Sequence, residues 1–334
     1  MIGDIYAGRT VAYSTFLGYD EVAHHSGIER PDTLATLREI DRQFARIEAA
    51  ARDAPRPYHL VVLADHGQTQ GTTFEDRYGT TLQQVVEEAC AAESAESATP
   101  GDEAVGYLSA SLTEASRGDN ALARTVRRAT EGRTADGAVV IGKEEREELR
   151  REKEREAPPE LIVLASGCLG LISFPRESGR VTLERIDERY PHVISTLRDH
   201  PGIGFVLARS EQYGAIAIGE QGLCFLDEHR VEGEDPLAPF GPNAAQHVKR
   251  ADGFPNCADI MVNSTYWPET GEVTAFEELV GSHGGLGGPQ SYPFVLVPRD
   301  WALPKEPIVG AEAMHRQMRR WLADLGHEAY RDGA

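Results

Sequence analysis

The stretch Leu60–Gly67, Leu-Val-Val-Leu-Ala-Asp-His-Gly, constrains the fold of this chain more than any other stretch. Its apolar run does not alternate with polar residues, which is typical of a strand covered on both faces of an α/β sheet. Asp65 and His66 follow the run directly, and the carboxyl ends of strands are where such sheets bind their ligands. The stretch therefore predicts a buried parallel strand with ligand-binding side chains at its tip.

A similar pattern lies upstream of this strand. Residues 10–18 are rich in β-branched and aromatic residues, which predicts a strand that runs directly into Asp20 and His24. Apolar residues then recur at helical spacing between Pro31 and Pro55, which predicts a helix. Strand, helix and strand form a β-α-β unit, for which parallel strands with a right-handed crossover are the default.

The pattern of the remaining chain predicts an α/β fold. After a polar loop at residues 68–73, we expect helices at residues 80–93, 190–199 and 311–325, and strands at residues 161–165, 204–208, 214–218, 223–226, 258–264 and 293–297. The expected architecture is a three-layer α/β/α fold with a mostly parallel sheet. The closely spaced strands near residues 200–230 are expected to pair as a meander.

The composition changes at residue 94. Residues 94–157 contain few large apolar side chains and end in a run of alternating charges, which indicates a loose, acidic insertion. We therefore divide the chain into residues 1–93, the first part of an α/β domain, residues 94–157, the insertion, and residues 158–330, the remainder of the domain.

The charge of the chain excludes some classes of partner. The formal net charge is -20, so the surface repels nucleic-acid backbones and anionic membranes, and no nucleic acid polymer is expected as a partner. No apolar run approaches the ~20 residues of a membrane-spanning helix, and residues 1–9 lack the pattern of a signal peptide. From these features we expect a soluble protein that is cytoplasmic by default.

Three clusters of candidate metal ligands stand out: Asp20 with His24, Asp65 with His66, and His283 in a glycine-dense loop. Carboxylate oxygens mixed with imidazole nitrogens suit zinc, or manganese and iron as competitors, better than calcium. Five ligands are too many for one tetrahedral ion, so the pattern favours two metals. Paired metals are a standard arrangement for displacement at phosphorus.

The spacing within the first cluster leaves two histidines to consider. His24 lies four residues after Asp20, so one turn of chain can present both side chains to a single ion, whereas the adjacent His25 breaks this spacing. We therefore favour His24 as the ligand, and leave His25 as a neighbouring or surface group.

The three clusters resemble motifs of a known family. Tyr19–Gly27 resembles the Asp-x-x-x-His-x-x-Gly element of the alkaline phosphatase superfamily, in particular its type I phosphodiesterase/nucleotide pyrophosphatase branch. Ala64–Gly67 resembles the Asp-His-Gly element of that branch, and Ser282–Gly285 its late His-Gly element, in the same order along the chain. The resemblance implies a zinc-dependent hydrolase that acts on a small-molecule phosphate ester.

The resemblance also assigns the ligands. It implies that Asp20, His24 and His283 hold one zinc ion and that Asp65 and His66 hold a second.

The chain departs from the family before Asp20. Members place a metal-binding Asp on a first strand and a Ser or Thr nucleophile at a later helix start, and only 19 residues precede Asp20 here. Ser14 and Thr15 lie in the predicted strand and do not match the nucleophile. We therefore expect the carboxyl-terminal part of a longer domain, with its second metal site incomplete, its nucleophile unknown and membrane association possible only through the missing region. The alternative is a non-catalytic metal-binding or interaction module derived from such an enzyme.

Overall fold

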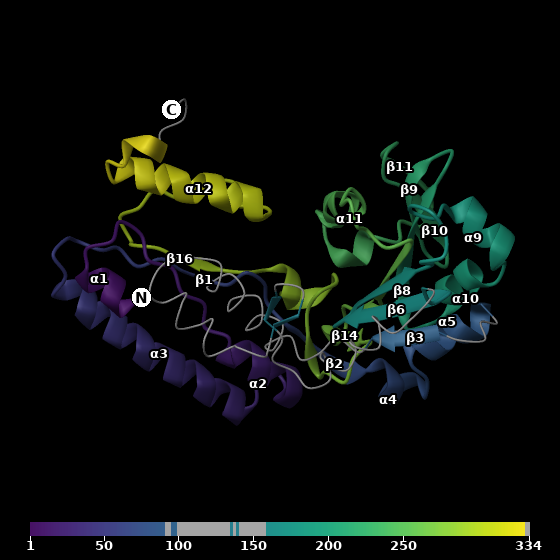
Figure 1. Ribbon diagram of the computed structural model, residues 1–334, viewed down its shortest axis with the longest axis horizontal. Coiled ribbons are helices and arrows are strands. Elements are labelled where there is room, and N and C mark those ends of the chain that lie inside the picture. Colours follow the sequence, from purple (N-terminus) through teal and green to yellow (C-terminus); the bar gives the residue numbers. More distant parts are fainter. Residues whose placement is uncertain (91–94, 99–133, 136–137, 140–157, 331–334) are drawn as a thin grey trace. The chain divides into compact units, whose positions relative to one another are not determined.

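The computed structural model describes residues 1–90, 95–98, 134–135, 138–139 and 158–330, and the chain separates into two units. Unit 1 comprises Met1–Ala12, Arg46–Asp65 and Phe294–Ala334, and unit 2 comprises Tyr13–Ala45 and His66–Pro293. Figure 1 labels their helices and strands. Most of the predicted insertion at residues 94–157 lies outside the described residues, and the division of the chain at residues 93 and 157 stays a prediction.

The largest element of unit 2 is an eight-stranded sheet with the order β11-β10-β9-β8-β12-β7-β6-β3. Its strands are β3 (Ala95–Ala98), β6 (Leu161–Ser166), β7 (Leu169–Ser173), β8 (Ile203–Ser210), β9 (Gly214–Ile218), β10 (Gly222–Phe225), β11 (Arg230–Gly233) and β12 (Ile260–Ser264). All neighbours pair antiparallel except β3 and β6, which are parallel. The predicted meander is confirmed.

The prediction of a mostly parallel sheet is wrong. Gly167 and Cys168 alone connect β6 to β7, and connections of this length can join only antiparallel neighbours, since a parallel pair needs a long crossover. The unbroken apolar runs have another origin, because the sheet is covered on both faces. In β8, Val206 packs into one core cluster and Leu207 into the other. An apolar run therefore reports burial on two sides and carries no information about strand direction.

Helices supply both covers of this sheet. One core cluster unites β8 and β12 with α5 (Leu82–Cys90), α9 (Leu183–Arg189) and α10 (Val193–Asp199). The other cluster unites the opposite face with η1 (Ala238–Phe240) and α11 (Ala244–Asp252). Figure 1 labels α11 beside this sheet. The structure is thus a mixed α/β fold.

A smaller sheet of unit 2 positions the candidate site. Its order is β13 (Tyr266–Trp267), β14 (Glu272–Ala275), β2 (Thr69–Thr73) and β15 (Gly281–Ser282), with β2 parallel to β14 and antiparallel to β15. The predicted loop at residues 68–73 is therefore mostly a strand. Its polar sequence shows no strand pattern, and it forms a strand because the main chains of β14 and β15, from far along the sequence, pair with it. Gly71 allows this close approach, since it lacks the Cβ that would collide with the oxygen of Val273. The short helix α4 (Phe74–Tyr78) follows β2.

The segment before Asp20 also differs from its prediction. Residues 10–17 form neither helix nor strand, and a helix, α2 (Gly18–Ser26), carries Asp20 and His24. In the described part of the chain, no sheet includes the aromatic and β-branched residues that suggested a strand, and Tyr13 is 79 % exposed. The next helix, α3 (Pro31–Arg52), is confirmed, and its residues divide between the two units after Ala45.

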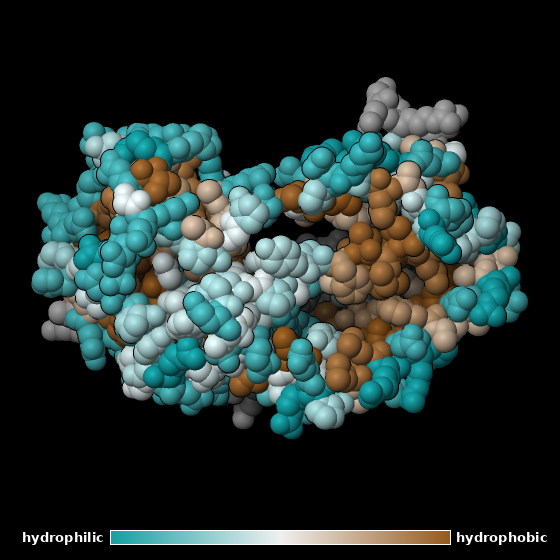
Figure 2. All heavy atoms as spheres, turned by 180° about the vertical axis from the view of Figure 1, so that it is seen from behind, coloured by the Kyte–Doolittle hydropathy of each residue, from teal (hydrophilic) through white to brown (hydrophobic). Residues whose placement is uncertain are grey.

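Unit 1 contains α1 (Ile2–Tyr6), the end of α3, β1 (Val62–Leu63), β16 (Val295–Leu296), α12 (Ala311–Asp324) and η3 (Glu328–Tyr330). The predicted buried parallel strand at residues 60–64 is a two-residue strand that pairs antiparallel with β16 and is only partly buried. β16 is its one partner in the described part of the chain, so Leu60 and Leu296 remain exposed. Figure 2 shows hydrophobic residues at the surface of the part that carries α12.

The predicted last helix is confirmed as α12, whose Trp321 is buried and donates its indole N–H to the oxygen of Ala302 at 3.1 Å. Among the described residues, no helix combines the length and the apolar character that crossing a bilayer requires.

Candidate metal centre

Helix α2 presents Asp20 and His24 on one face, one turn apart. The Nε2 atom of His24 lies 3.4 Å from Oδ2 of Asp20, and the imidazole is buried. The neighbouring His25 has a side chain that is 60 % exposed, and its Nε2 lies 3.5 Å from Oε1 of Glu21. The helix therefore turns His24, and not His25, toward Asp20.

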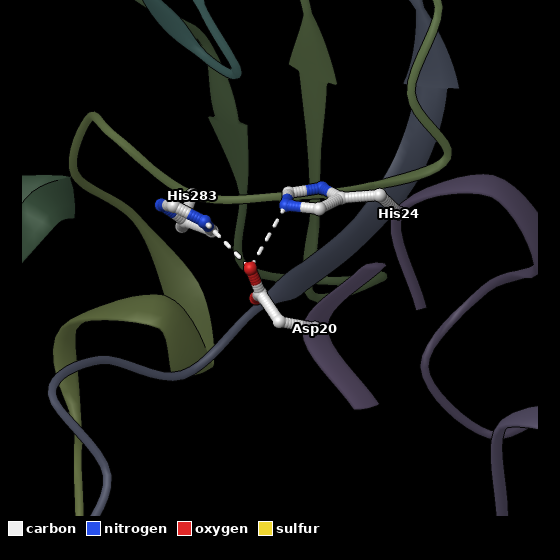
Figure 3. Close-up of side chains that lie close together, drawn as sticks. All are labelled: Asp20, His24 and His283. Carbon is white, nitrogen blue, oxygen red and sulfur yellow. Dashed lines mark ion pairs between the residues drawn. The ribbon is translucent and has the colours of Figure 1, made fainter. Parts of the chain in front are cut away.

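His283, which lies close to the last residue of unit 2 in the sequence, approaches the same carboxylate. It follows β15 directly, and its Nε2 lies 3.6 Å from Oδ2 of Asp20. Figure 3 shows both imidazoles directed at this one oxygen. The glycine-dense loop permits the approach, because Gly284 has a φ of 105° and lacks a Cβ that would collide with Ser166.

The protonation of His24 follows from its second hydrogen bond. Its Nδ1 lies 2.7 Å from the main-chain oxygen of Gly281, and a carbonyl oxygen can only accept. Nδ1 therefore carries a proton, and Nε2 is the nitrogen that faces Asp20. A histidine whose Nδ1–H is held in this way by a backbone carbonyl can bind a metal ion through Nε2, which loses its proton when the ion binds.

The three side chains fit a metal ion. Each offers one ligand atom, and the three atoms lie within 4.8 Å of one another. In a tetrahedral zinc site with bonds of about 2.0 to 2.2 Å, neighbouring ligand atoms stand roughly 3.3 to 3.6 Å apart. The distances of 3.4 and 3.6 Å from Asp20 Oδ2 to His24 Nε2 and His283 Nε2 match this spacing. Two nitrogens and one oxygen suit zinc, and also manganese or iron.

Gln68 completes the surroundings of Asp20. Its Nε2 donates to the main-chain oxygen of Asp20 at 3.0 Å and to Oδ1 at 2.5 Å. Burial disfavours the ionised form of Asp20, but hydrogen bonds from His24, His283 and Gln68 outweigh it and hold the pKa of Asp20 well below its usual range. Asp20 is thus a carboxylate at neutral pH. Gln68 was not predicted as a site residue, and its one local signal in the sequence is its place beside the Asp-His-Gly motif.

The two members of the second predicted ligand pair fall in different units. His66 belongs to unit 2, where its ring stacks on that of His283 with centroids 3.7 Å apart. Asp65 ends a segment of unit 1. Neither is one of the three residues whose ligand atoms converge, so the second ion stays a prediction.

The comparisons with known proteins agree with the motifs. Residues 9–167 match the family model of type I phosphodiesterase / nucleotide pyrophosphatase, which confirms the resemblance. This range includes Asp20, His24, Asp65 and His66, and His283 lies beyond it. No curated protein and no solved structure matches the chain.

Proposed function

We propose, from the match of residues 9–167 to the type I phosphodiesterase / nucleotide pyrophosphatase family model, that this chain is a metal-dependent hydrolase of small-molecule phosphate esters. The observation that carries the proposal is the convergence of His24 and His283 on one oxygen of Asp20, within 3.4 and 3.6 Å. The family supplies the reaction class, and the side chains supply a site with the donor atoms that such a reaction needs.

Asp20, His24 and His283 would hold the first ion, which we propose to be zinc, with manganese or iron as competitors. By the family resemblance, Asp65 and His66 would hold a second. A bound divalent ion polarises a phosphoryl oxygen and neutralises the charge that develops on it. We further propose that the helices on both faces of the larger sheet belong to a three-layer, alkaline phosphatase-like architecture.

The residues of the chain have distinct parts in this proposal. Asp20 supplies the negative charge that attracts a cation, and its low pKa keeps that charge in place at neutral pH. His24 is held by Gly281 with its Nε2 directed toward the site. The net charge of -20 repels an anionic substrate at long range, so the attraction for a phosphate ester has to come from the bound ions.

The attacking group is not part of this triad, which contains one carboxylate and two imidazoles and no alcohol. A phosphorylated side-chain intermediate would need a Ser or Thr beside the site. The non-catalytic metal-binding module therefore remains the alternative outcome of the test.

The test combines metal analysis with activity. The purified chain is expected to contain about one to two equivalents of zinc and to hydrolyse bis-p-nitrophenyl phosphate or p-nitrophenyl phosphate. Asp20→Ala should abolish metal binding and lower the hydrolysis rate by at least about 100-fold, since Lewis-acid stabilisation contributes several kcal/mol. His25→Ala, on the exposed side of the same helix, is the matched control. Bound zinc without hydrolysis of either ester would support the non-catalytic module, and hydrolysis that survives Asp20→Ala would refute the proposed site.

A further inference from the structure

We propose that Gln68 is a positioning residue of the metal centre, which holds Asp20 so that a single carboxylate oxygen, Oδ2, is presented to the ion. The inference rests on the proposed metal site. It adds to the triad a residue that cannot be a strong ligand itself but determines how the one anionic member of the triad, Asp20, is oriented.

Gln68 holds both the side chain and the backbone of Asp20. A glutamine amide carries two N–H groups, and here Nε2 lies 3.0 Å from the main-chain oxygen and 2.5 Å from Oδ1 of Asp20. Gln68 is 7 % exposed, so water cannot easily replace these contacts. The torsion that rotates a carboxylate has a broad energy minimum, and a hydrogen bond to Oδ1 is what selects one orientation.

As a consequence, the two carboxylate oxygens of Asp20 have different partners. Oδ1 faces the amide of Gln68, while Oδ2 faces the Nε2 atoms of His24 and His283. Asp20 is therefore arranged as a monodentate ligand. Without the amide, the carboxylate could turn both oxygens toward an ion or away from it, and the site would lose its preorganisation.

Glutamine suits this position better than a charged donor. A Lys or Arg could also donate to Oδ1, but its positive charge would repel the metal ion and neutralise Asp20. The amide provides two donors without a charge.

The surroundings leave space for this amide. A Cβ on Gly281 would lie 2.6 Å from Oε1 of Gln68, so a larger residue would displace it. Gln68 also follows His66 by two residues, and the ring of His66 stacks on His283. Residues 66–68 therefore contact both His283, through the ring of His66, and Asp20, through the hydrogen bonds of Gln68.

The test compares Gln68→Met with the wild-type chain. Methionine keeps the length of the side chain and removes both donors. Zinc affinity is measured by competition with a chromophoric chelator, and the thermal midpoint is measured with and without zinc. We expect zinc to bind about 10- to 100-fold more weakly, as for other residues that orient metal ligands. The midpoint of the metal-free protein should match that of Gln317→Met, a control at an equally buried glutamine of unit 1.

A second variant covers the case in which Gln68→Met does not fold. Gln68→Asn keeps the amide but is one methylene shorter, so it cannot reach both acceptors, and it should also weaken zinc binding without loss of metal-free stability. Zinc affinity within about twofold of the wild type would overturn the inference. A weaker affinity would also overturn it if the loss of stability of the metal-free protein accounts for the whole change. A wild-type chain that binds zinc but cleaves no phosphate ester would overturn only the proposed hydrolase, and one that binds no zinc would overturn both.

Discussion

His24 and Gly281 are joined by a hydrogen bond of 2.7 Å from the imidazole Nδ1 to the main-chain oxygen. A second bond runs between the same two segments, because the N–H of Val280 donates to the main-chain oxygen of His24 at 2.9 Å. Helix α2 is thus hydrogen-bonded to Gly281, the first residue of β15, and to Val280, the residue before it, close to His283. The bond orients one candidate ligand, His24, and the other, His283, directly follows the strand that accepts this bond.

Replacement of Gly281 should damage the centre without removing a ligand. In Gly281→Ala the new Cβ would lie 2.6 Å from the oxygen of Ala23 and 2.6 Å from Oε1 of Gln68. Helix and strand would have to move apart, at a cost of about 1 to 3 kcal/mol in the free energy of unfolding. Urea denaturation and zinc titration should both detect the change.

The control for this prediction is Gly3→Ala, because a Cβ on Gly3 meets nothing within 4 Å and its φ is not positive. It should leave stability and zinc affinity close to those of the wild type. If Gly281→Ala is as stable and binds zinc as tightly as Gly3→Ala, then the contact between α2 and β15 does not determine the geometry of the site.

His66 provides a test of the second ion. In His66→Phe the aromatic ring can still stack on His283, but both ring nitrogens are lost. If His66 holds a second ion, zinc content should fall from about two equivalents to about one, because Asp20, His24 and His283 keep the first. Elemental analysis after dialysis measures the content. An unchanged stoichiometry would remove His66 from the ligand set, while His283→Phe should instead deplete the first site.

The cysteine thiols should be protected from alkylation while the chain is folded. Burial raises the pKa of Cys90 to about 12, with a smaller contribution from the nearby negative charge of Glu160, and burial also raises the pKa of Cys168. Since the thiolate is the reactive form, both residues should react with iodoacetamide at pH 8 far more slowly than in the chain unfolded by guanidinium. Mass spectrometry of the alkylated peptides measures the rates.

The sign of the corresponding effect on stability follows from the raised pKa of Cys90. The folded state favours the neutral thiol of Cys90. The stabilisation that this preference gives to the folded state is complete below the ordinary thiol pKa of 9.0 and is lost as the pH rises through about 12. Cys90→Ser should therefore flatten the alkaline part of the stability curve and leave the part near pH 7 with the same slope. Equal alkylation rates of Cys90 in the folded and unfolded chain would contradict the conclusion that burial raises the pKa of its thiol.

Local sequence patterns predicted those helices and strands that form because of the spacing of their own apolar side chains. The helical spacing of apolar residues predicted α3 and α12, and apolar runs predicted β6, β8 and β9. The motifs around Asp20, His24 and His283 indicated a set of ligands because metal coordination needs particular donor atoms, and these are visible in the residue types alone.

Tertiary structure decided everything that depends on a partner distant in sequence. Strand direction was mispredicted, because an apolar run records burial on two faces and not the direction of its neighbour. Residues 10–18 lack a strand because no other strand pairs with them in the described part of the chain, whereas polar β2 is a strand because β14 and β15 supply its hydrogen bonds.

The same division holds within the site. The spacing of Asp20 and His24 could be read from the sequence, but only the fold shows that His24 is buried while His25 is exposed, and that Gln68 donates to Asp20. Sequence determines which chemical groups are available. The long-range pairing of α2, β2 and β15 determines which of them meet, because contacts between segments hundreds of residues apart leave no local pattern to read.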